Sequence, residues 1–316
     1  MTMFKAAVTI KLGRIGANIL TARALIRVTL ASALCAGIGG CGVRQTHMAK
    51  VPAPVPLQTA AKPDLVAKYD ALAGSITSIN ASVVMHQISS SKNTGIIKDY
   101  PRVSGFILAQ KPDLLRVIGQ APVIGTDIFT MVSDGKTFSI YIPSKNEFLT
   151  GPADLEHPSE QTAEDLRPEQ LMQAIFWEPI PSSDLVLMEE TTENGTGDYV
   201  LTVAAKSPDA GGNGTNWAIA RKIWFERVGL TMSRIQIYGG QGEVASDIQY
   251  SSWQMMDGVQ YPAQITLMRP AEGYTLGITV TKLTANQQIP AARFVLNQPT
   301  GTRLVQVGEE AGSGPN

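Results

Sequence analysis

The feature that most constrains this chain is an alternation of apolar and polar residues with a period of two, which recurs through most of its length. It is clear at Phe138, Ile140 and Ile142, and it returns at Tyr199–Val203 and Leu276–Val280. Successive side chains of a β-strand point to opposite faces, so this alternation is typical of strands with one buried and one solvated face. We therefore expect the fold to be dominated by a sheet.

Short turn signals separate these strands. They are rich in Gly, Asn and Asp, which tolerate the backbone conformations of tight hairpin turns. The clearest are Ser133–Gly135, Glu193–Gly195, Gly239–Gly242 and Asp257–Gly258. Consecutive strands are therefore predicted to be antiparallel neighbours, and we count about ten or eleven of them.

Two segments follow a helical spacing of three and four residues instead. The first covers Asp64–Ile79 after Pro63, and the second begins at Pro168 and runs to Trp177. Proline is favoured in the first turn of a helix, and the apolar residues of each segment share one face. We predict an α+β, mostly β fold, in which a large curved antiparallel sheet forms an incomplete barrel with the helices packed on its concave face.

The N-terminal segment has the features of an export signal. Residues 1–40 contain five basic residues and no acidic one, and the apolar stretch Val28–Gly40 is shorter than the ~20 residues of a membrane-spanning helix. The stretch Ile38–Cys41 resembles the bacterial lipobox, in which the cysteine is lipid-modified and becomes the mature N-terminus. We therefore predict residues 1–40 to be a lipoprotein signal peptide and Cys41 to be the lipidation site.

The cysteine count agrees with lipidation. The chain has two cysteines, and Cys35 lies in the segment that would be removed, so the mature chain has no partner for Cys41 in a disulfide. A diacylated or triacylated cysteine would anchor the protein stably in a membrane. The alternative is an ordinary secretory signal that leaves Cys41 as a free thiol.

The remaining chain divides into three parts. Residues 41–62 are predicted to be a Pro/Ala-rich tether, residues 63–298 a single domain, and residues 299–316 a flexible tail. Gly42 follows the lipidated cysteine, where Asp favours retention in the inner membrane of well-studied enteric bacteria. By that analogy we expect a periplasm-facing protein anchored in the outer membrane, with the inner membrane as the alternative.

The charge balance excludes one class of partner. Without residues 1–40 the chain has 21 basic and 27 acidic residues, and no cluster of Lys and Arg. Such a surface lacks the positive charge that nucleic-acid binding requires, so we expect no nucleic-acid partner and a membrane association through the lipid anchor. The sequence does not indicate an oligomeric state.

The arrangement of elements resembles the LolA/LolB-like superfamily of periplasmic lipoprotein carriers and outer-membrane receptors, which have an unclosed antiparallel barrel lidded by helices. The resemblance covers about Pro63 to Asn297 and rests on organisation and weak motifs. Its features are an amphipathic helix leading into the first strand, the stretch Lys111–Val117 followed by Ser133–Lys136 and Tyr141–Pro143, and the late pair Trp253–Pro262 and Ile265–Leu267.

The resemblance implies a hydrophobic cavity between sheet and helices that holds acyl chains, such as palmitate, of a lipid or lipoprotein client. The candidate ligand-binding residues are apolar residues expected on the inward face of the sheet: Leu115, Val117, Phe129, Phe138, Ile140, Ile265 and Leu267. Methionines suit an adaptable apolar wall, and five fall in predicted strands or helices: Met85, Met131, Met172, Met232 and Met268. For every one of these residues an ordinary place in the core is the alternative, because any curled sheet buries such a face.

The residues that catalysis needs do not form a recognisable pattern. His86 and His157 have no metal-ligand spacing, no Gly-x-Ser-x-Gly elbow is present, and Gly211–Gly214 lacks the Lys and Ser/Thr of a phosphate-binding loop. We therefore expect no enzyme activity, no metal and no cofactor. Two function classes remain: an envelope factor that handles lipids or lipoproteins, and a non-enzymatic scaffold or sensor whose interior is filled by its own side chains.

Overall fold

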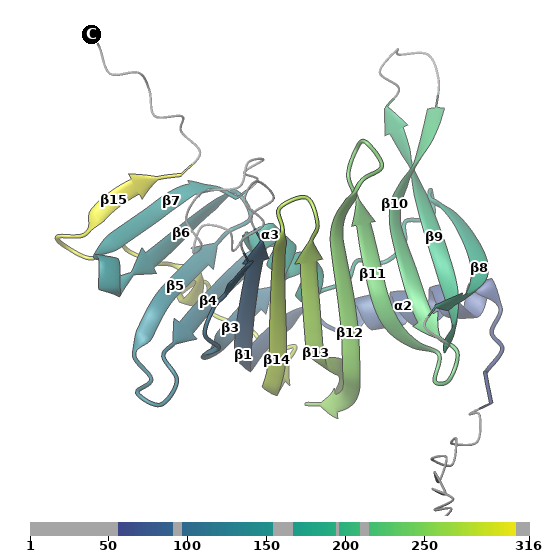
Figure 1. Cartoon of the computed structure of the whole chain (residues 1–316), viewed down its shortest axis with the longest axis horizontal. Coiled ribbons are helices and arrows are strands. Elements are labelled where there is room, and N and C mark those ends of the chain that lie inside the picture. The colour runs from purple at the N-terminus through teal and green to yellow at the C-terminus, as the bar shows by residue number, and fades with distance from the viewer. Residues whose placement is uncertain (1–55, 91–96, 154–166, 194–195, 209–214, 308–316) are drawn as a thin grey trace, which may run out of the picture. The chain divides into compact units, whose positions relative to one another are not determined.

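The alternating segments form one large sheet (Figure 1). The computed structural model describes residues 56–90, 97–153, 167–193, 196–208 and 215–307. In these residues the sheet has fifteen strands. Fourteen lie in the order β15-β7-β6-β5-β4-β3-β1-β14-β13-β12-β11-β10-β9-β8, and the fifteenth, β2, pairs with β1. Neighbouring strands are antiparallel, except that β15 runs parallel to β7. The sheet does not close, because β15 and β8 lie at opposite ends of this order, and the predicted incomplete barrel is confirmed.

The elements have the following bounds. The first part of the chain contains α2 (Lys62–Gly74), β1 (Ser78–Ser90), β2 (Ile97–Asp99), β3 (Val103–Gln110), β4 (Leu114–Gln120), β5 (Asp127–Ser133), β6 (Thr137–Ile142), the short 3₁₀ helix η1 (Pro143–Lys145) and β7 (Glu147–Pro152). The second part contains α3 (Pro168–Ile175), β8 (Leu185–Glu193), β9 (Thr196–Pro208), β10 (Thr215–Glu226), β11 (Thr231–Tyr238), β12 (Val244–Met256), β13 (Val259–Arg269), β14 (Tyr274–Ala285), the 3₁₀ helix η2 (Ala291–Phe294) and β15 (Arg303–Gln306).

The four turn signals mark the ends of antiparallel strand pairs. They separate β5 from β6, β8 from β9, β11 from β12, and β12 from β13. Gly135 and Gly258 have φ angles of 84° and 79°, which glycine adopts without the steric cost of a side chain. The prediction of antiparallel neighbours is therefore confirmed at these hairpins.

Both helices are shorter than their apolar spacing predicts. α2 ends at Gly74, and Ser78 already begins β1. α3 ends at Ile175, and Phe176 has extended backbone angles. The prolines at 179 and 181 explain this second boundary, because proline lacks the N–H that would continue a helix and restricts the residue before it.

The helices cover one face of the sheet and complete its core. Leu65, Tyr69 and Ala73 of α2 are buried in the same cluster as Leu171 and Ile175 of α3. The strands contribute their inward-facing apolar residues to this cluster, which is the arrangement that the period-two pattern predicts. No helix in the described part of the chain is long and apolar enough to cross a membrane.

Three features differ from the sequence predictions. The described residues contain fifteen strands where we expected about ten or eleven, partly because short strands such as β2 carry no alternation. Residues 303–306 form β15 within the predicted flexible tail, because their backbone pairs with β7. The end of the predicted tether also packs on the domain: the Gln58 N–H donates to the Arg227 carbonyl at 2.7 Å. Residues 1–55, which include Cys41, lie outside the described part of the chain.

Candidate functional site

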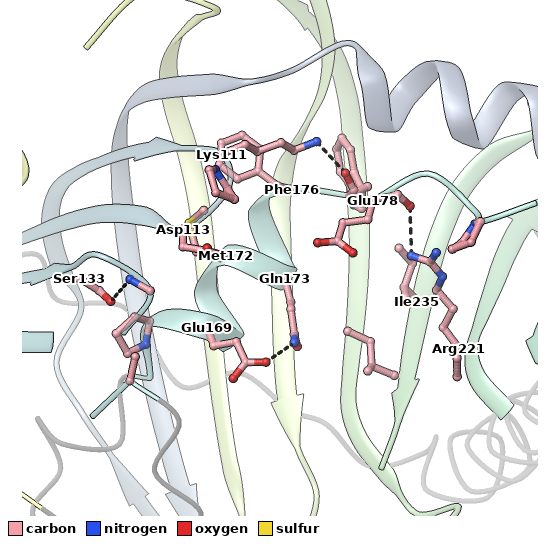
Figure 2. Close-up of a pocket in the computed structure, with 18 of the residues that line it drawn as sticks. Lys111, Asp113, Ser133, Glu169, Met172, Gln173, Phe176, Glu178, Arg221 and Ile235 are labelled. Carbon is pink, nitrogen blue, oxygen red and sulfur yellow. Dashed lines mark hydrogen bonds between the residues drawn. The ribbon is translucent and has the colours of Figure 1, made fainter. Parts of the chain in front are cut away.

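A pocket of about 840 Å³ lies beside α3 on the helix-covered side of the sheet (Figure 2). Its walls come from α3, the segment that follows it, β10 and β11, and the turns that precede β4 and β6. Apolar contributors include Met172, Phe176, Ile235 and Ile237, of which Ile237 is only half-buried. The volume is within the range of ~300 to 1,000 Å³ that is usual for small-molecule sites.

Residues 175–180, which we call the strap, connect α3 to the second part of the sheet and form one wall of the pocket. The strap is extended, and side chains from distant elements hold its backbone. The Tyr261 hydroxyl donates to the Ile175 carbonyl at 3.0 Å, and the Ile180 N–H donates to Asp70 Oδ1 at 2.8 Å. Buried backbone groups need such partners when they lie outside a helix or sheet ladder.

Lys111 links the strap to the end of α2. Its Nζ donates to the carbonyls of Ala73 and Trp177, each at 2.8 Å, and lies 5.5 Å from the centre of the Phe176 ring. Burial lowers the pKa of Lys111, and the nearby Glu178 carboxylate opposes that effect. The ammonium group therefore neutralises the carbonyl end of α2 and fixes the strap with one side chain.

Arg221 holds the strap from β10. Its guanidinium donates to the carbonyls of Glu178 and Pro179, each at 3.1 Å, and to the Tyr69 hydroxyl at 3.1 Å. Burial raises the pKa of Tyr69 to about 12, although the charge of Arg221 acts in the opposite direction. Two cations from opposite sides of the pocket thus bind the strap through its backbone.

Carboxylates give the pocket a polar margin. Asp113, Glu169, Glu178 and Asp184 line it, and none of them forms an ion pair within the described residues. Glu169 accepts a hydrogen bond from Gln173 at 3.0 Å, as Figure 2 shows. The combination of an apolar wall with a charged margin suits a ligand that has both an apolar and a polar part.

A second, smaller pocket of about 310 Å³ lies beside α2. Leu72 of α2 lines it together with Phe225, Met232 and Val259 from the sheet. Trp253 also lines it, and the Trp253 indole N–H donates to the Met232 carbonyl at 2.8 Å. This pocket is more apolar in its lining than the first.

The loop between β4 and β5 carries exposed apolar side chains. Val123 is fully exposed and Ile124 is 74% exposed, although both are large and apolar. Val123 has a φ of 79°, a conformation that is costly for a β-branched residue. The backbone thus holds an apolar tip in solvent, which is a feature of surfaces that contact a membrane or a partner.

The seven predicted ligand-binding residues lie elsewhere. Six of them are fully buried in the core, and Phe129 is partly buried against it; neither pocket includes any of the seven in its lining: Leu115, Val117, Phe129, Phe138, Ile140, Ile265 and Leu267. Their role as ligand contacts stays a prediction. Of the five methionines, Met172 lines the first pocket and Met232 the second.

Sequence reasoning missed the residues that shape the pocket. Lys111 and Arg221 appear in the sequence as ordinary surface cations, and Tyr69 as a helix-face residue. The closely spaced Pro179 and Pro181 were the available signal, because they predict an extended crossing segment whose carbonyls need donors. Within the described residues no group of three or more His, Cys, Asp or Glu could hold a metal ion.

Comparison with known proteins gives likenesses of fold. No protein-family model and no curated protein matches the chain. A LolA superfamily protein from Nitrosomonas europaea is similar at 10% identity and a TM-score of 0.45, with 75% of this chain and 99% of that chain covered. A DUF1329 family protein from Desulfovibrio piger is 16% identical with a TM-score of 0.44, over 73% of this chain and 95% of that one.

A third solved structure is a domain from Vibrio parahaemolyticus described as an outer membrane lipoprotein-sorting protein. It is 12% identical with a TM-score of 0.44, over 73% of this chain and 94% of that chain. All three solved structures are at most 16% identical to this chain and cover about three quarters of it.

Proposed function

We propose that this protein binds the acyl chain of a lipid or lipoprotein in the pocket beside α3, as a non-enzymatic factor of the bacterial envelope. The observation that carries the proposal is the pocket of about 840 Å³ with an apolar wall and a charged margin. An acyl chain would contact Met172 and Ile237, and its polar end would lie among the margin residues. Methionine suits such a wall because its flexible thioether adapts to ligands of different shape.

A lipid anchor and the loop tip would together hold this function at a membrane surface. A lipidated Cys41 would hold the domain at the periplasmic face of the outer membrane, and the apolar tip of the β4–β5 loop would contact a lipid surface during transfer. Burying the side chains of Val123 and Ile124 contributes about 1.5 to 3 kcal/mol each, which is enough for reversible contact and too little for permanent insertion.

A scaffold or sensor function is the second candidate, and one observation favours it. Most of the inward face of the sheet is packed: Leu115, Val117 and Leu201 have no exposed surface. A domain that only displays its surface needs no internal space, and it would have such a core.

One substitution pair tests the proposal. Ile237 is half-buried and lines the pocket, so Ile237→Glu should place a carboxylate in the path of the acyl chain without opening the core. Ile219→Glu on β10 is the control, because Ile219 is exposed and lines neither pocket. We expect wild type and Ile219→Glu to take up a fluorescent fatty acid and Ile237→Glu to lose uptake while it stays folded.

Mass spectrometry of lipids that co-purify with the protein gives an independent readout. Acylated molecules bound to wild type and depleted in Ile237→Glu agree with the proposal. If the wild type carries no lipid and takes up no fatty acid, the scaffold or sensor function is favoured instead.

A further inference from the structure

Both pockets border α2. Tyr69 of this helix lines the first pocket, whereas Lys68, Ala71 and Leu72 line the second. The helix therefore crosses above the path that would join them. Only the side chains between α2 and the sheet decide whether the pockets communicate.

A cluster of four aromatic side chains separates the pockets. Trp177 lines the first pocket and Trp253 the second, and their ring centres are 5.7 Å apart. Tyr250 and Tyr261 complete the cluster at 5.7 and 5.8 Å from the Trp177 ring. This is one layer of contacting rings, since stacked or edge-on aromatic pairs have centroids about 4.5 to 7 Å apart.

The two tryptophans are held differently. The Trp253 N–H is fixed by its hydrogen bond to the Met232 carbonyl. The Trp177 N–H lies near the Tyr250 hydroxyl, but neither group completes a hydrogen bond in the described residues. A buried donor without a good partner is unfavourable, so the Trp177 ring is held mainly by its packing against the neighbouring rings. Trp177 also belongs to the strap, whose backbone is held by side chains from other elements.

We propose that the second pocket is the distal end of the acyl-chain site and that Trp177 is the gate between its two parts. This inference rests on the proposed function and names the ligand class more narrowly: an amphiphile with a chain too long for the first pocket. The chain enters beside α3, displaces the Trp177 ring, passes under α2 and ends against Leu72, Phe225 and Val259. Short chains occupy the first pocket only.

Chain-length dependence tests this arrangement. The experiment uses alkylphosphocholines from octyl to hexadecyl, below their critical micelle concentrations, with affinity measured by calorimetry on the full chain carrying Cys41→Ser. Each buried methylene raises affinity about fourfold. In the wild type the rise continues until both pockets are filled.

Ala71→Trp should fill the second pocket from α2, where Ala71 is exposed and a larger side chain disturbs no core. The rise in affinity then stops at a shorter chain, while the affinity for octyl and decyl ligands is unchanged. Ala67→Trp is the matched control, since Ala67 is exposed on the same helix and lines neither pocket. Gln260→Trp should fill the same pocket from β13. The same result with this variant would show that the effect comes from filling the pocket and not from changing α2.

Trp177→Ala removes the gate. Because Trp177 also lines the first pocket, short-chain affinity changes too, and the expected result is a rise in the ratio of long-chain to short-chain affinity relative to wild type. Two outcomes would overturn the inference while the proposed function stands. In one, wild type and Ala71→Trp depend on chain length in the same way. In the other, Ala71→Trp loses affinity equally for ligands of every chain length. Failure of every alkylphosphocholine to bind the wild type would refute the proposed function and this inference with it.

Discussion

Replacing Lys111 by Met is the most informative single substitution in this fold. Lys111→Met keeps most of the aliphatic stem and its contact with Phe176, but it removes the ammonium group that donates to the Ala73 and Trp177 carbonyls. Both acceptor residues are almost completely buried. The substitution therefore leaves two carbonyls without their donor, at the end of α2 and in the strap.

The expected cost follows from these two bonds. A hydrogen bond to a charged group contributes about 1.5 to 3 kcal/mol, and a buried acceptor left without a partner costs a similar amount. Desolvation of the ammonium group, recorded in the lowered pKa of Lys111, offsets part of the gain. We expect Lys111→Met to lower the free energy of unfolding by about 2 to 4 kcal/mol. For a domain of this size, that corresponds to a fall in Tm of roughly 4 to 16 °C.

Chemical denaturation measures this change directly. The midpoint should fall while the slope with denaturant stays constant, because the surface exposed on unfolding is unchanged. Lys282→Met is the matched control, since Lys282 is exposed on β14 and its side chain forms no hydrogen bond or ion pair within the described residues. A loss below about 0.5 kcal/mol, equal to that of Lys282→Met, would refute the role of Lys111 as the link between α2 and the strap.

Three further predictions address other parts of the chain. Cys41→Ser should abolish fatty-acid incorporation in metabolic labelling, and labelling that persists would place the anchor elsewhere. Deleting residues 42–55 should leave the unfolding free energy unchanged, whereas a deletion that continues to residue 61 should cost about 1 to 3 kcal/mol. The longer deletion removes the bonds that Gln58 donates to the Arg227 and Val228 carbonyls and the bond that the Arg227 side chain donates to the Gln58 carbonyl. Equal stability of the two deletions would contradict this. Burial raises the pKa of Tyr69 from 10.0 to about 12, so between these pH values the folded state keeps a proton that the unfolded state releases. The free energy of unfolding should therefore fall by about 2 to 3 kcal/mol as the pH rises from 10 to 12. Thermal unfolding measured over this pH range tests the assignment, and an equal loss in Tyr69→Phe and wild type would argue against it.

The sequence predicts the sheet well because its information is local. The alternation at Phe138–Ile142 and the Asp134–Gly135 turn specify adjacent antiparallel strands without reference to the rest of the chain. The parallel pairing of β15 with β7 joins residues far apart in sequence, and β15 has only four residues. No periodicity could reveal that pair, which is why residues 303–306 were predicted to be part of a flexible tail.

The candidate site was less accessible to sequence reasoning for a physical reason. Inward-facing residues such as Ile140 and Ile265 were correctly expected to be buried, but the pattern cannot distinguish a packed face from one that borders open space. The shape of the pocket depends on where α3 and the strap lie relative to the sheet. Lys111 and Arg221 fix the strap by donating to its backbone carbonyls. Every residue has a backbone carbonyl, so the sequence does not indicate which carbonyls Lys111 and Arg221 bind, and only the structure shows these contacts.

The position of β1 in the sheet has a consequence for folding during synthesis. β1 is the first strand in the chain, yet it lies at the centre, between β3 and β14, so that Ile79 pairs with Ala285. A chain that is synthesised from its N-terminus can form β1 to β7 early, but one side of β1 then has its N–H and C=O groups open to other strands until β14 is made. Its long-range closure makes folding slow relative to a protein with local contacts, and the new chain has an unpaired strand edge until its last strands are available.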